Sequence, residues 1–228
     1  MASEIKLYNM DCMTAMKEMK DKQFDLAIVD PPYGLGRDGQ REDIKNGFKG
    51  YKFKEWDSHP PNFMYFLELS RVSKNQIIWG ANHFISNIDN KNSSCWLVWD
   101  KCQRDFSFAD GEMAWTSFDS SLRIFSFSRG SALAENNKRG GAFHPTQKPV
   151  ELVARAIFNS SQPKDIVADF FCGSGTTLLA CEQHDRVCYA MEFEPRYCEV
   201  ICQRWESYTG QKRKLVKNSE NDVPTASN

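Results

Sequence analysis

Apolar residues along the chain gather into short runs that alternate with segments whose apolar positions follow a helical period. Eight runs are rich in β-branched and aromatic residues and are predicted to form strands: residues 5–8, 24–30, 76–79, 95–99, 113–118, 123–127, 166–171 and 186–191. Five segments carry the helical pattern: residues 13–19, 62–72, 149–159, 176–183 and 196–208. In the last segment, one face collects Tyr197, Val200, Ile201, Trp205 and Tyr208.

The order of these elements predicts the fold class. Strands that alternate with helices form a parallel, doubly wound α/β sheet with helices on both faces. The runs at 113–118 and 123–127 have no helix between them. They are therefore expected to form an antiparallel hairpin within an otherwise parallel sheet.

Two stretches interrupt this alternation. Residues 34–60 are too long for an ordinary strand-to-helix connection, and residues 128–143 are rich in Gly, Ser and Asn. Long loops in compact domains usually have a function of their own. The polar residues 211–228 are expected to form a disordered tail. Since a chain of 228 residues suits one domain, residues 1–210 are predicted to form a single domain.

Composition narrows the classes of protein and of partner. The net charge is -1, so a nucleic-acid surface would have to come from local clusters of Lys and Arg. The chain is too long for the disulfide-stapled class and shows no signal peptide, so its eight cysteines are expected to be reduced thiols in a cytoplasm. Cys198 and Cys202 have no matching second pair, which argues against a zinc site. No apolar run approaches the ~20 residues of a membrane-spanning helix.

An acid and an aromatic ring are held rigidly at the end of the second apolar run. Asp30 follows Val29 directly, and Pro31 and Pro32 separate it from Tyr33. Each proline fixes its own φ, so the acid and the ring are held in a defined relation. Taken alone, such a segment can also merely end a strand and open a turn. The glycines at 34 and 36 are expected to act as a hinge for the long stretch 34–60, which carries many Lys and Arg residues.

A second strand runs into a glycine-rich turn, with the sequence D-I-V-A-D-F-F-C-G-S-G-T-T at 165–177. Gly173 and Gly175 let the backbone approach a ligand and expose N–H groups at a helix start. The turn lacks the Gly-Lys-Ser/Thr of a phosphate loop, and Leu178 replaces the third glycine of the dinucleotide fingerprint. The next strand ends at Glu192, where an acid can accept hydrogen bonds from ribose hydroxyls. A nucleoside without a pyrophosphate is therefore expected, and S-adenosylmethionine fits that description.

Four motifs together resemble the DNA amino-methyltransferases, which act on adenine N6 or cytosine N4. They are Asn9-Met10-Asp11-Cys12, Asp30-Pro31-Pro32-Tyr33, His144-Pro145-Thr146-Gln147-Lys148-Pro149 and Phe171-Cys172-Gly173-Ser174-Gly175. Met10 departs from the family pattern, which usually has glycine there. The catalytic motif precedes the cofactor turn, as in the circularly permuted β group of the family. The resemblance spans residues 5–208.

The resemblance implies a mostly parallel, seven-stranded sheet of the S-adenosylmethionine-dependent methyltransferase type with one antiparallel strand. The catalytic and cofactor strands would be central neighbours, where the strand order reverses and ligands bind. The run at 5–8 would supply the strand that follows the Glu192 strand in an unpermuted sheet.

The resemblance also implies a role for each motif. Asp30 and the Pro31 carbonyl would accept hydrogen bonds from the target amine, Pro32 would keep them aimed, and Tyr33 would stack on a base flipped out of the duplex. The methyl group would pass by direct displacement, without a metal or a cysteine adduct. Cofactor contacts are expected from Asp11, Cys12, Asp30, Lys148, Phe171, Gly173, Ser174, Gly175, Thr176, Glu192 and Phe193. Among these, Asp11 would bond the cofactor adenine, and Lys148 is a candidate for its carboxylate.

Basic residues in the two irregular stretches are expected to bind the phosphates of double-stranded DNA: Arg37, Arg41, Lys45, Lys49, Lys52, Lys54, Lys138 and Arg139. A solvated loop is the alternative for these charges. The chain has no room for a large target-recognition domain. A short site, a partner subunit or second copy of the chain, or little sequence preference is therefore expected. The resemblance further implies a bacterial or phage protein, and without a nuclease motif it would be a methylase alone.

Several activities remain open at this point. Asp30 favours adenine N6, because cytosine-N4 enzymes more often have Ser at that position. Methylation of RNA adenine is a further alternative, although Tyr33 rather than Trp leans toward DNA. Glutamine methylation of a protein normally uses Asn in place of Asp30 and the unpermuted order. A non-catalytic nucleic-acid-binding subunit would not need an intact Asp30, Tyr33 and glycine turn.

Overall fold

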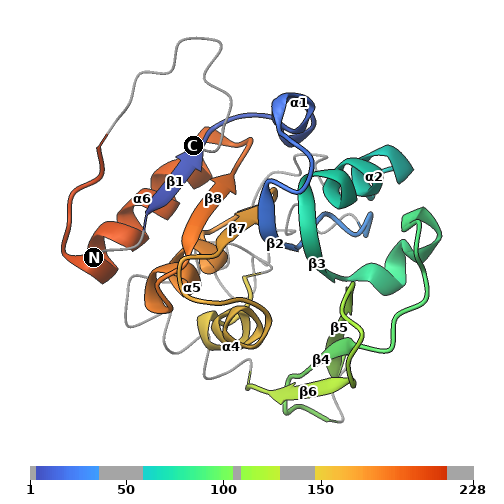
Figure 1. Ribbon diagram of the computed structural model, residues 1–228. Helices are drawn as coiled ribbons and strands as arrows, with labels where there is room; N and C mark the ends of the chain where they lie inside the picture. Colours follow the sequence, from blue (N-terminus) through green and yellow to red (C-terminus); the bar gives the residue numbers. More distant parts are fainter. Residues whose placement is uncertain (1–3, 36–58, 105–108, 129–146, 215–228) are drawn as a thin grey trace, which may run out of the picture.

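The computed structural model describes residues 4–35, 59–104, 109–128 and 147–214. An eight-stranded sheet forms its centre, with the strand order β1-β8-β7-β2-β3-β5-β4-β6 (Figure 1). The strands are β1 (Ile5–Tyr8), β2 (Phe24–Val29), β3 (Ser73–Trp79), β4 (Trp96–Asp100), β5 (Gly111–Thr116), β6 (Arg123–Ser126), β7 (Ile166–Asp169) and β8 (Val187–Met191). All eight apolar runs therefore form strands, and the doubly wound α/β class is confirmed.

The sheet has eight strands where the resemblance implied seven. Strand β6 adds the eighth, and it pairs in parallel with β4 at one edge. Among the strands described, β5 alone is antiparallel to its neighbours, so the expectation of one antiparallel strand is confirmed. The permuted order is confirmed as well, because β1 pairs in parallel with β8.

The hairpin expected between 113–118 and 123–127 is wrong. Strand β5 pairs with β3 on one side and β4 on the other, so neither of its edges is available to β6. The antiparallel hairpin is instead β4–β5, and β6 lies on the far side of β4, where Trp99 pairs with Phe125. The indole N–H of Trp99 donates to the Phe127 carbonyl at 2.8 Å, which fastens the end of this edge strand.

Helices cover both faces of the sheet. Helices α1 (Cys12–Glu18) and α2 (Phe63–Val72) pack on one face, and α4 (Val150–Ser160), α5 (Thr176–Gln183) and α6 (Pro195–Thr209) pack on the other (Figure 1). Strand β2 alternates between them: Leu26 and Ile28 join the core under α4–α6, and Ala27 and Val29 join the core under α1 and α2. Such alternation follows from the two-residue period of a strand.

Two short 3-10 turns, η2 (Ala81–His83) and η3 (Ile85–Asn87), follow β3. Gly80 starts η2 with φ of 69°, in the left-handed region that glycine adopts without strain. All eight cysteines have free thiols, and five of them are buried. In the described part of the chain, no helix has the length and apolar character needed to cross a membrane.

Several sequence expectations lie outside the described residues. These are the basic positions of the 34–60 stretch, both basic positions of the 128–143 stretch, and the first three residues of the His144 motif. The first four residues of the proposed tail, 211–214, are described, and Arg213 pairs there with Glu199 at 2.8 Å.

Candidate active site

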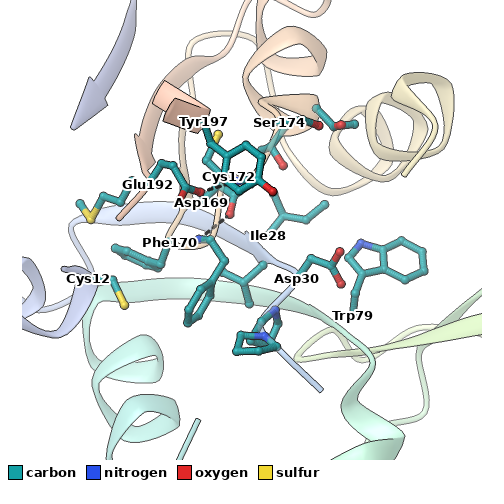
Figure 2. Close-up of a pocket in the computed structure, with 18 of the residues that line it drawn as sticks. Cys12, Ile28, Asp30, Trp79, Asp169, Phe170, Cys172, Ser174, Glu192 and Tyr197 are labelled. Carbon is teal, nitrogen blue, oxygen red and sulfur yellow. Dashed lines mark hydrogen bonds between the residues drawn. The ribbon is translucent and has the colours of Figure 1, made fainter. Parts of the chain in front are cut away.

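A cavity of about 550 Å³ opens at the carboxyl ends of the central strands. Strands β2 and β7 are neighbours in the middle of the sheet, and the chain winds outward from them in opposite directions. Ligands bind at such a reversal point in open α/β sheets. Figure 2 shows the lining residues: Asp30 and Trp79 lie on one side of the cavity, and Asp169 and Glu192 lie on another.

Asp30 follows the last residue of β2 and is held by two donors. The Tyr33 hydroxyl donates to Oδ1 of Asp30 at 2.6 Å, and the Lys148 ammonium lies 2.6 Å from the same oxygen. The two residues between Asp30 and Tyr33 are both proline, and their fixed φ angles hold the acid and the ring in a tight unit. Asp30 is therefore an oriented carboxylate whose Oδ1 is already engaged by the protein.

Lys148 is a buried ammonium at the centre of a charge cluster. Its side chain is only 5% exposed, and it contacts Glu112 at 3.1 Å as well as Asp30 at 2.6 Å. Burial alone would lower the pKa of Lys148, but Asp30 and Glu112 outweigh burial and raise it. Lys148 is therefore charged at neutral pH. Its partners here are side chains of the chain itself, and its proposed role toward a cofactor carboxylate remains a prediction.

The Tyr33 ring packs closely against the turn that follows β3. It stacks on His83 with 5.0 Å between ring centroids and 19° between planes. A Cβ at Gly80 would lie 2.1 Å from Cε1 of Tyr33, so only glycine lets the ring sit there. Gly34, which follows the ring, lies against Pro60: a Cβ at Gly34 would be 2.7 Å from Pro60 Cδ. The two ends of the 34–60 stretch therefore meet beside Tyr33.

The glycine turn between β7 and α5 is shaped by backbone geometry. Gly173 and Gly175 have φ of 57° and 84°, which L side chains rarely adopt. A Cβ at Gly175 would also lie 2.9 Å from Cγ2 of Ile201 on α6. Arg204, one turn along α6, donates to the carbonyl of Ser174 and to its Oγ. Helix α6 thus packs against the glycine turn and holds its backbone conformation.

Glu192 directly follows the last residue of β8 and is held by backbone N–H groups. Gly173 N donates to Oε2 and Glu194 N donates to Oε1, each at 2.8 Å. Burial raises the pKa of Glu192, and these backbone donors only partly offset the effect. The carboxylate is therefore bonded directly to the glycine turn and lines the cavity beside it.

Asp169 is a buried acid that the motif analysis did not single out as a site residue. It ends β7, lines the cavity, and accepts a hydrogen bond from Phe171 N at 3.0 Å. Burial raises the pKa of Asp169 to about 7, although hydrogen bonds from Thr177 and Phe171 oppose the shift. The signal in the sequence was available, because an acid at the end of an apolar strand just before the glycine turn resembles Asp30 in position.

Gly175 is absent from the cavity lining, and the remaining cofactor candidates line it. These are Asp11, Cys12, Phe171, Ser174, Thr176 and Phe193. Asp11 is the N-cap of α1, where its side chain accepts from Thr14 N at 2.7 Å. Burial raises the pKa of Cys12 to about 12, so its thiol stays protonated. Phe193 is 76% exposed and lies at the mouth.

Two further residues of the cavity wall escaped the sequence analysis because strand pairing brings them in. Glu112 is the second residue of β5 and contacts Lys148, and Trp79 ends β3. The Trp79 side chain is buried, and its Nε1 has no hydrogen-bond partner among the residues that the structure describes. A buried donor of this kind is available to a ligand.

Comparison with known proteins identifies the class to which this fold and site belong. A family model described as DNA methylase matches residues 81–203, which is more than half of the chain. The chain therefore belongs to the DNA methylase family. The amino-methyltransferase resemblance of the four motifs is confirmed.

Individual relatives cover nearly the whole chain. The Type II methyltransferase M2.MboI of Moraxella bovis is 26% identical over 245 residues, covering 89% of this chain and 88% of that protein. The solved M1.HpyAVI–SAM complex superposes with a TM-score of 0.60 at 22% identity, covering 88% of this chain and 99% of that chain. The PvuII DNA methyltransferase (cytosine-N4-specific) gives a TM-score of 0.61 at 17% identity, covering 90% of this chain and 87% of that chain.

Proposed function

We propose that this protein transfers a methyl group from S-adenosylmethionine to the exocyclic N6 amine of an adenine in double-stranded DNA. One observation carries the proposal. The oriented carboxylate of Asp30 and the glycine turn at Gly173 line the same cavity, at the point where the sheet reverses its strand order. Membership of the DNA methylase family supports it.

The residues of the cavity fit the proposed methyl donor. The glycine turn brings backbone close to a ligand, and Glu192 is a carboxylate suited to ribose hydroxyls. Asp169 is a buried acid that suits a cationic ammonium group, and an amino-acid tail carries one. Phe171 offers an aromatic wall to an adenine. Bound here, S-adenosylmethionine supplies a methyl group activated by its sulfonium centre.

Asp30 and the Pro31 carbonyl act as acceptors for the N–H groups of the target amine. The lone pair of such an amine is delocalised into the ring, and two aimed acceptors favour the geometry in which it can attack. The gain comes from positioning and electrostatics, because the acceptors need no reorganisation during the reaction. Pro31 and Pro32 have fixed φ angles, and so they hold the two acceptors in this arrangement before the base arrives.

Tyr33 is the proposed platform for the flipped base. A base inside a duplex cannot reach a cavity of this kind, so it must leave the helix. The ring of Tyr33 is backed by His83 and by the Gly80 backbone, which limits its freedom. A ring with few accessible orientations gives up little entropy when a base stacks on it.

Cytosine N4 is the second candidate for the accepting atom. The PvuII DNA methyltransferase, which is cytosine-N4-specific, superposes on 90% of this chain with a TM-score of 0.61, so the fold is compatible with cytosine as the target base. The residue at position 30 favours adenine, because it is Asp rather than Ser.

The proposed DNA contacts are the eight basic residues of the two irregular stretches. If they bind phosphates, the binding constant falls steeply with salt, with a slope of about −0.9 per contact on logarithmic axes. Fluorescence anisotropy with a labelled duplex measures this slope, and Lys49→Ala is expected to reduce it by about one. Bacterial relatives support a place for the protein beside DNA in a cytoplasm.

The decisive experiment uses purified protein, S-adenosylmethionine labelled in its methyl group, and unmethylated genomic DNA. After digestion to nucleosides, chromatography with mass detection identifies the labelled product. Label in N6-methyladenine supports the proposal, label in N4-methylcytosine transfers it to the second candidate, and no label in DNA contradicts both. Single-stranded RNA in a parallel reaction tests the RNA alternative.

A further inference from the structure

Four side chains of alternating charge form a row along the edge of the sheet that carries the cavity. Lys101 Nζ lies 2.7 Å from Oε1 of Glu112, and Lys148 Nζ lies 3.1 Å from Oε2 of the same carboxylate. Lys148 then reaches Oδ1 of Asp30 at 2.6 Å. Glu112 therefore uses a different oxygen for each of two lysines and joins them into one chain of contacts.

The sheet topology explains why these residues meet. Strand β5 is antiparallel to β3, so its first residues lie beside the carboxyl ends of the other strands. In the β4–β5 hairpin, Asp100 pairs with Gly111, and Lys101 and Glu112 flank that pair. Lys101 N donates to the Asp110 carbonyl at 2.9 Å, which closes the hairpin at this point. The row thus runs from the hairpin to the end of β2.

Every N–H of the Lys148 ammonium has an acceptor in the chain. The three acceptors are Asp30 Oδ1, Glu112 Oε2 and, at 3.2 Å, the Tyr33 hydroxyl. The ammonium also lies 5.3 Å from the centre of the Trp79 ring. An ammonium has three donors, so its position and rotation are both fixed by this set. Without Glu112, one of the three bonds would be lost and the ammonium would be free to turn.

The row is also balanced in charge, with two acids and two ammonium groups. Burial alone would raise the pKa of Glu112, but Lys148 and Lys101 outweigh burial and hold that pKa at about 2. Glu112 is therefore ionised throughout the neutral range. Removing its charge would leave two buried cations facing Asp30, an arrangement that is costly in a partly desolvated site.

We infer that Glu112 and Lys101 are positioning residues for the reacting carboxylate: they hold Lys148, and Lys148 in turn aims Asp30. The inference rests on the proposed function, since it assigns the row to the methyl-transfer site. Lys148 and Tyr33 both bond Oδ1 of Asp30. Within the described residues Oδ2 has no hydrogen-bond partner, and the row therefore presents that oxygen to the target amine.

The first test compares the kinetics of variants along the row. Glu112→Gln keeps the size of the side chain but replaces one carboxylate oxygen with an NH2 donor, so it can no longer offer a separate oxygen to each lysine. We expect it to lower kcat at least tenfold while KM for S-adenosylmethionine changes less than threefold. Glu112→Asp is expected to recover part of the loss. The matched control is Lys74→Met, which removes an exposed ion pair to Asp25 near the opposite end of β2 and is expected to leave kcat unchanged.

A double-mutant cycle shows whether Lys101 acts through Glu112. Lys101→Met alone is expected to lower kcat a few-fold, and the same change in the Glu112→Gln background is expected to have no further effect. Effects that simply multiply would mean that Lys101 acts elsewhere. An unchanged kcat in Glu112→Gln, with the wild type active, would overturn the inference and leave the proposed function standing.

A crystal structure of Glu112→Gln decides the geometric claim without any activity. We expect Lys148 Nζ to have left its position against Asp30 or to occupy more than one rotamer. An unchanged Lys148–Asp30 contact would overturn the inference. If the wild type transfers no methyl group to DNA, the proposed function fails, and this structure still shows whether Glu112 positions Lys148.

Discussion

The two sides of the cavity hold their acids by different kinds of contact. At the end of β2, Asp30 is held by the side chains of Lys148 and Tyr33. Across the cavity, backbone N–H groups hold Glu192, and Asp169 accepts from Phe171 N and from the Thr177 side chain. Neither of these two acids forms an ion pair within the described residues, whereas Asp30 does.

This difference separates two electrostatic tasks. The Asp30 side is neutralised by Lys148 and is suited to an uncharged base with N–H donors. The Glu192 and Asp169 side keeps an excess of negative charge, which suits a methyl donor that carries a sulfonium and an ammonium. Most donors on this second side are backbone N–H groups, which only a substitution to proline removes, so this side depends mainly on chain conformation. The Asp30 side depends instead on side chains that come from distant strands.

The largest expected effect is the loss of kcat when Asp30 itself is substituted. Asp30→Asn keeps the shape of the side chain but removes its charge and half of its acceptor capacity. Removal of one group that stabilises developing charge typically costs about 10²–10³-fold in kcat, and we expect a loss of that size. Steady-state methylation of a duplex measures it. Asp25→Asn, on the same strand, is the control, and an Asp30→Asn enzyme as active as that control would contradict the assignment.

Glycine substitutions test the Glu192 and Asp169 side of the cavity, which depends on the backbone conformation of the glycine turn. Gly175→Ala forces a side chain into the left-handed region and places its Cβ 2.9 Å from Cγ2 of Ile201. We expect a loss of unfolding free energy of about 3 kcal/mol and weaker binding of S-adenosylmethionine. Gly210→Ala is the matched control, because Gly210 has φ of 70° but no atom within 4 Å of the added Cβ. Its expected loss is about 1 kcal/mol. Equal losses would show that contact with α6 does not matter.

The burial of Asp169 predicts that the free energy of unfolding depends on pH. The pKa of Asp169 is about 7 in the folded chain, against ~3.9 for an unfolded Asp. Because the folded pKa is raised, the carboxyl destabilises the fold progressively as pH rises between these values, and most above the folded one. Asp169→Asn is therefore expected to be more stable than the wild type near pH 8, by at least about 1 kcal/mol.

Urea unfolding of the Asp169→Asn variant and of the wild type at about pH 5 and pH 8 measures this effect. The advantage of the variant should shrink toward the lower pH, where Asp169 is protonated in the folded state. A difference that stays the same at both pH values would show that Asp169 does not titrate in this range.

The smallest expected effect is the loss of one donor to Asp30. Tyr33→Phe keeps the ring that stacks on His83 and removes the hydroxyl, which donates to Oδ1 of Asp30 and is the most distant of the three acceptors of Lys148, at 3.2 Å. Since Lys148 still holds that oxygen, we expect kcat to fall only about fivefold, which corresponds to about 1 kcal/mol. KM for DNA should not change. Tyr33→Ala should raise KM for DNA, and a Tyr33→Phe loss as large as that of Asp30→Asn would make the hydroxyl itself essential.

The sequence predicted the elements that local pattern controls. Eight apolar runs became eight strands, and the five helical segments became helices, because period and propensity act over a few residues. The rigid Asp30 unit and the left-handed turn at Gly173 and Gly175 were predictable for the same reason. Proline fixes φ at its own position, and glycine permits a positive φ that other residues rarely adopt.

The sequence alone did not determine which strands pair at the β5 edge. The order β3-β5-β4-β6 decides that β5 pairs with β4 rather than with β6, and no local signal distinguishes these arrangements. The same pairing places Glu112 and Lys101 beside Lys148. From the sequence alone, Glu112 and Lys101 would be taken as solvent-exposed charges at strand ends, because Lys148 lies far along the chain.

Local chemistry therefore determined what the site contains at positions 30 to 33 and 173 to 175: a rigid acceptor, an aromatic ring and a backbone turn. Tertiary structure decided how that acceptor is charged and aimed, and that Asp169 is buried enough for its pKa to rise. The physical reason is the range over which each effect acts. Backbone conformation is set by neighbours in sequence, whereas desolvation and ion pairing are set by neighbours in space.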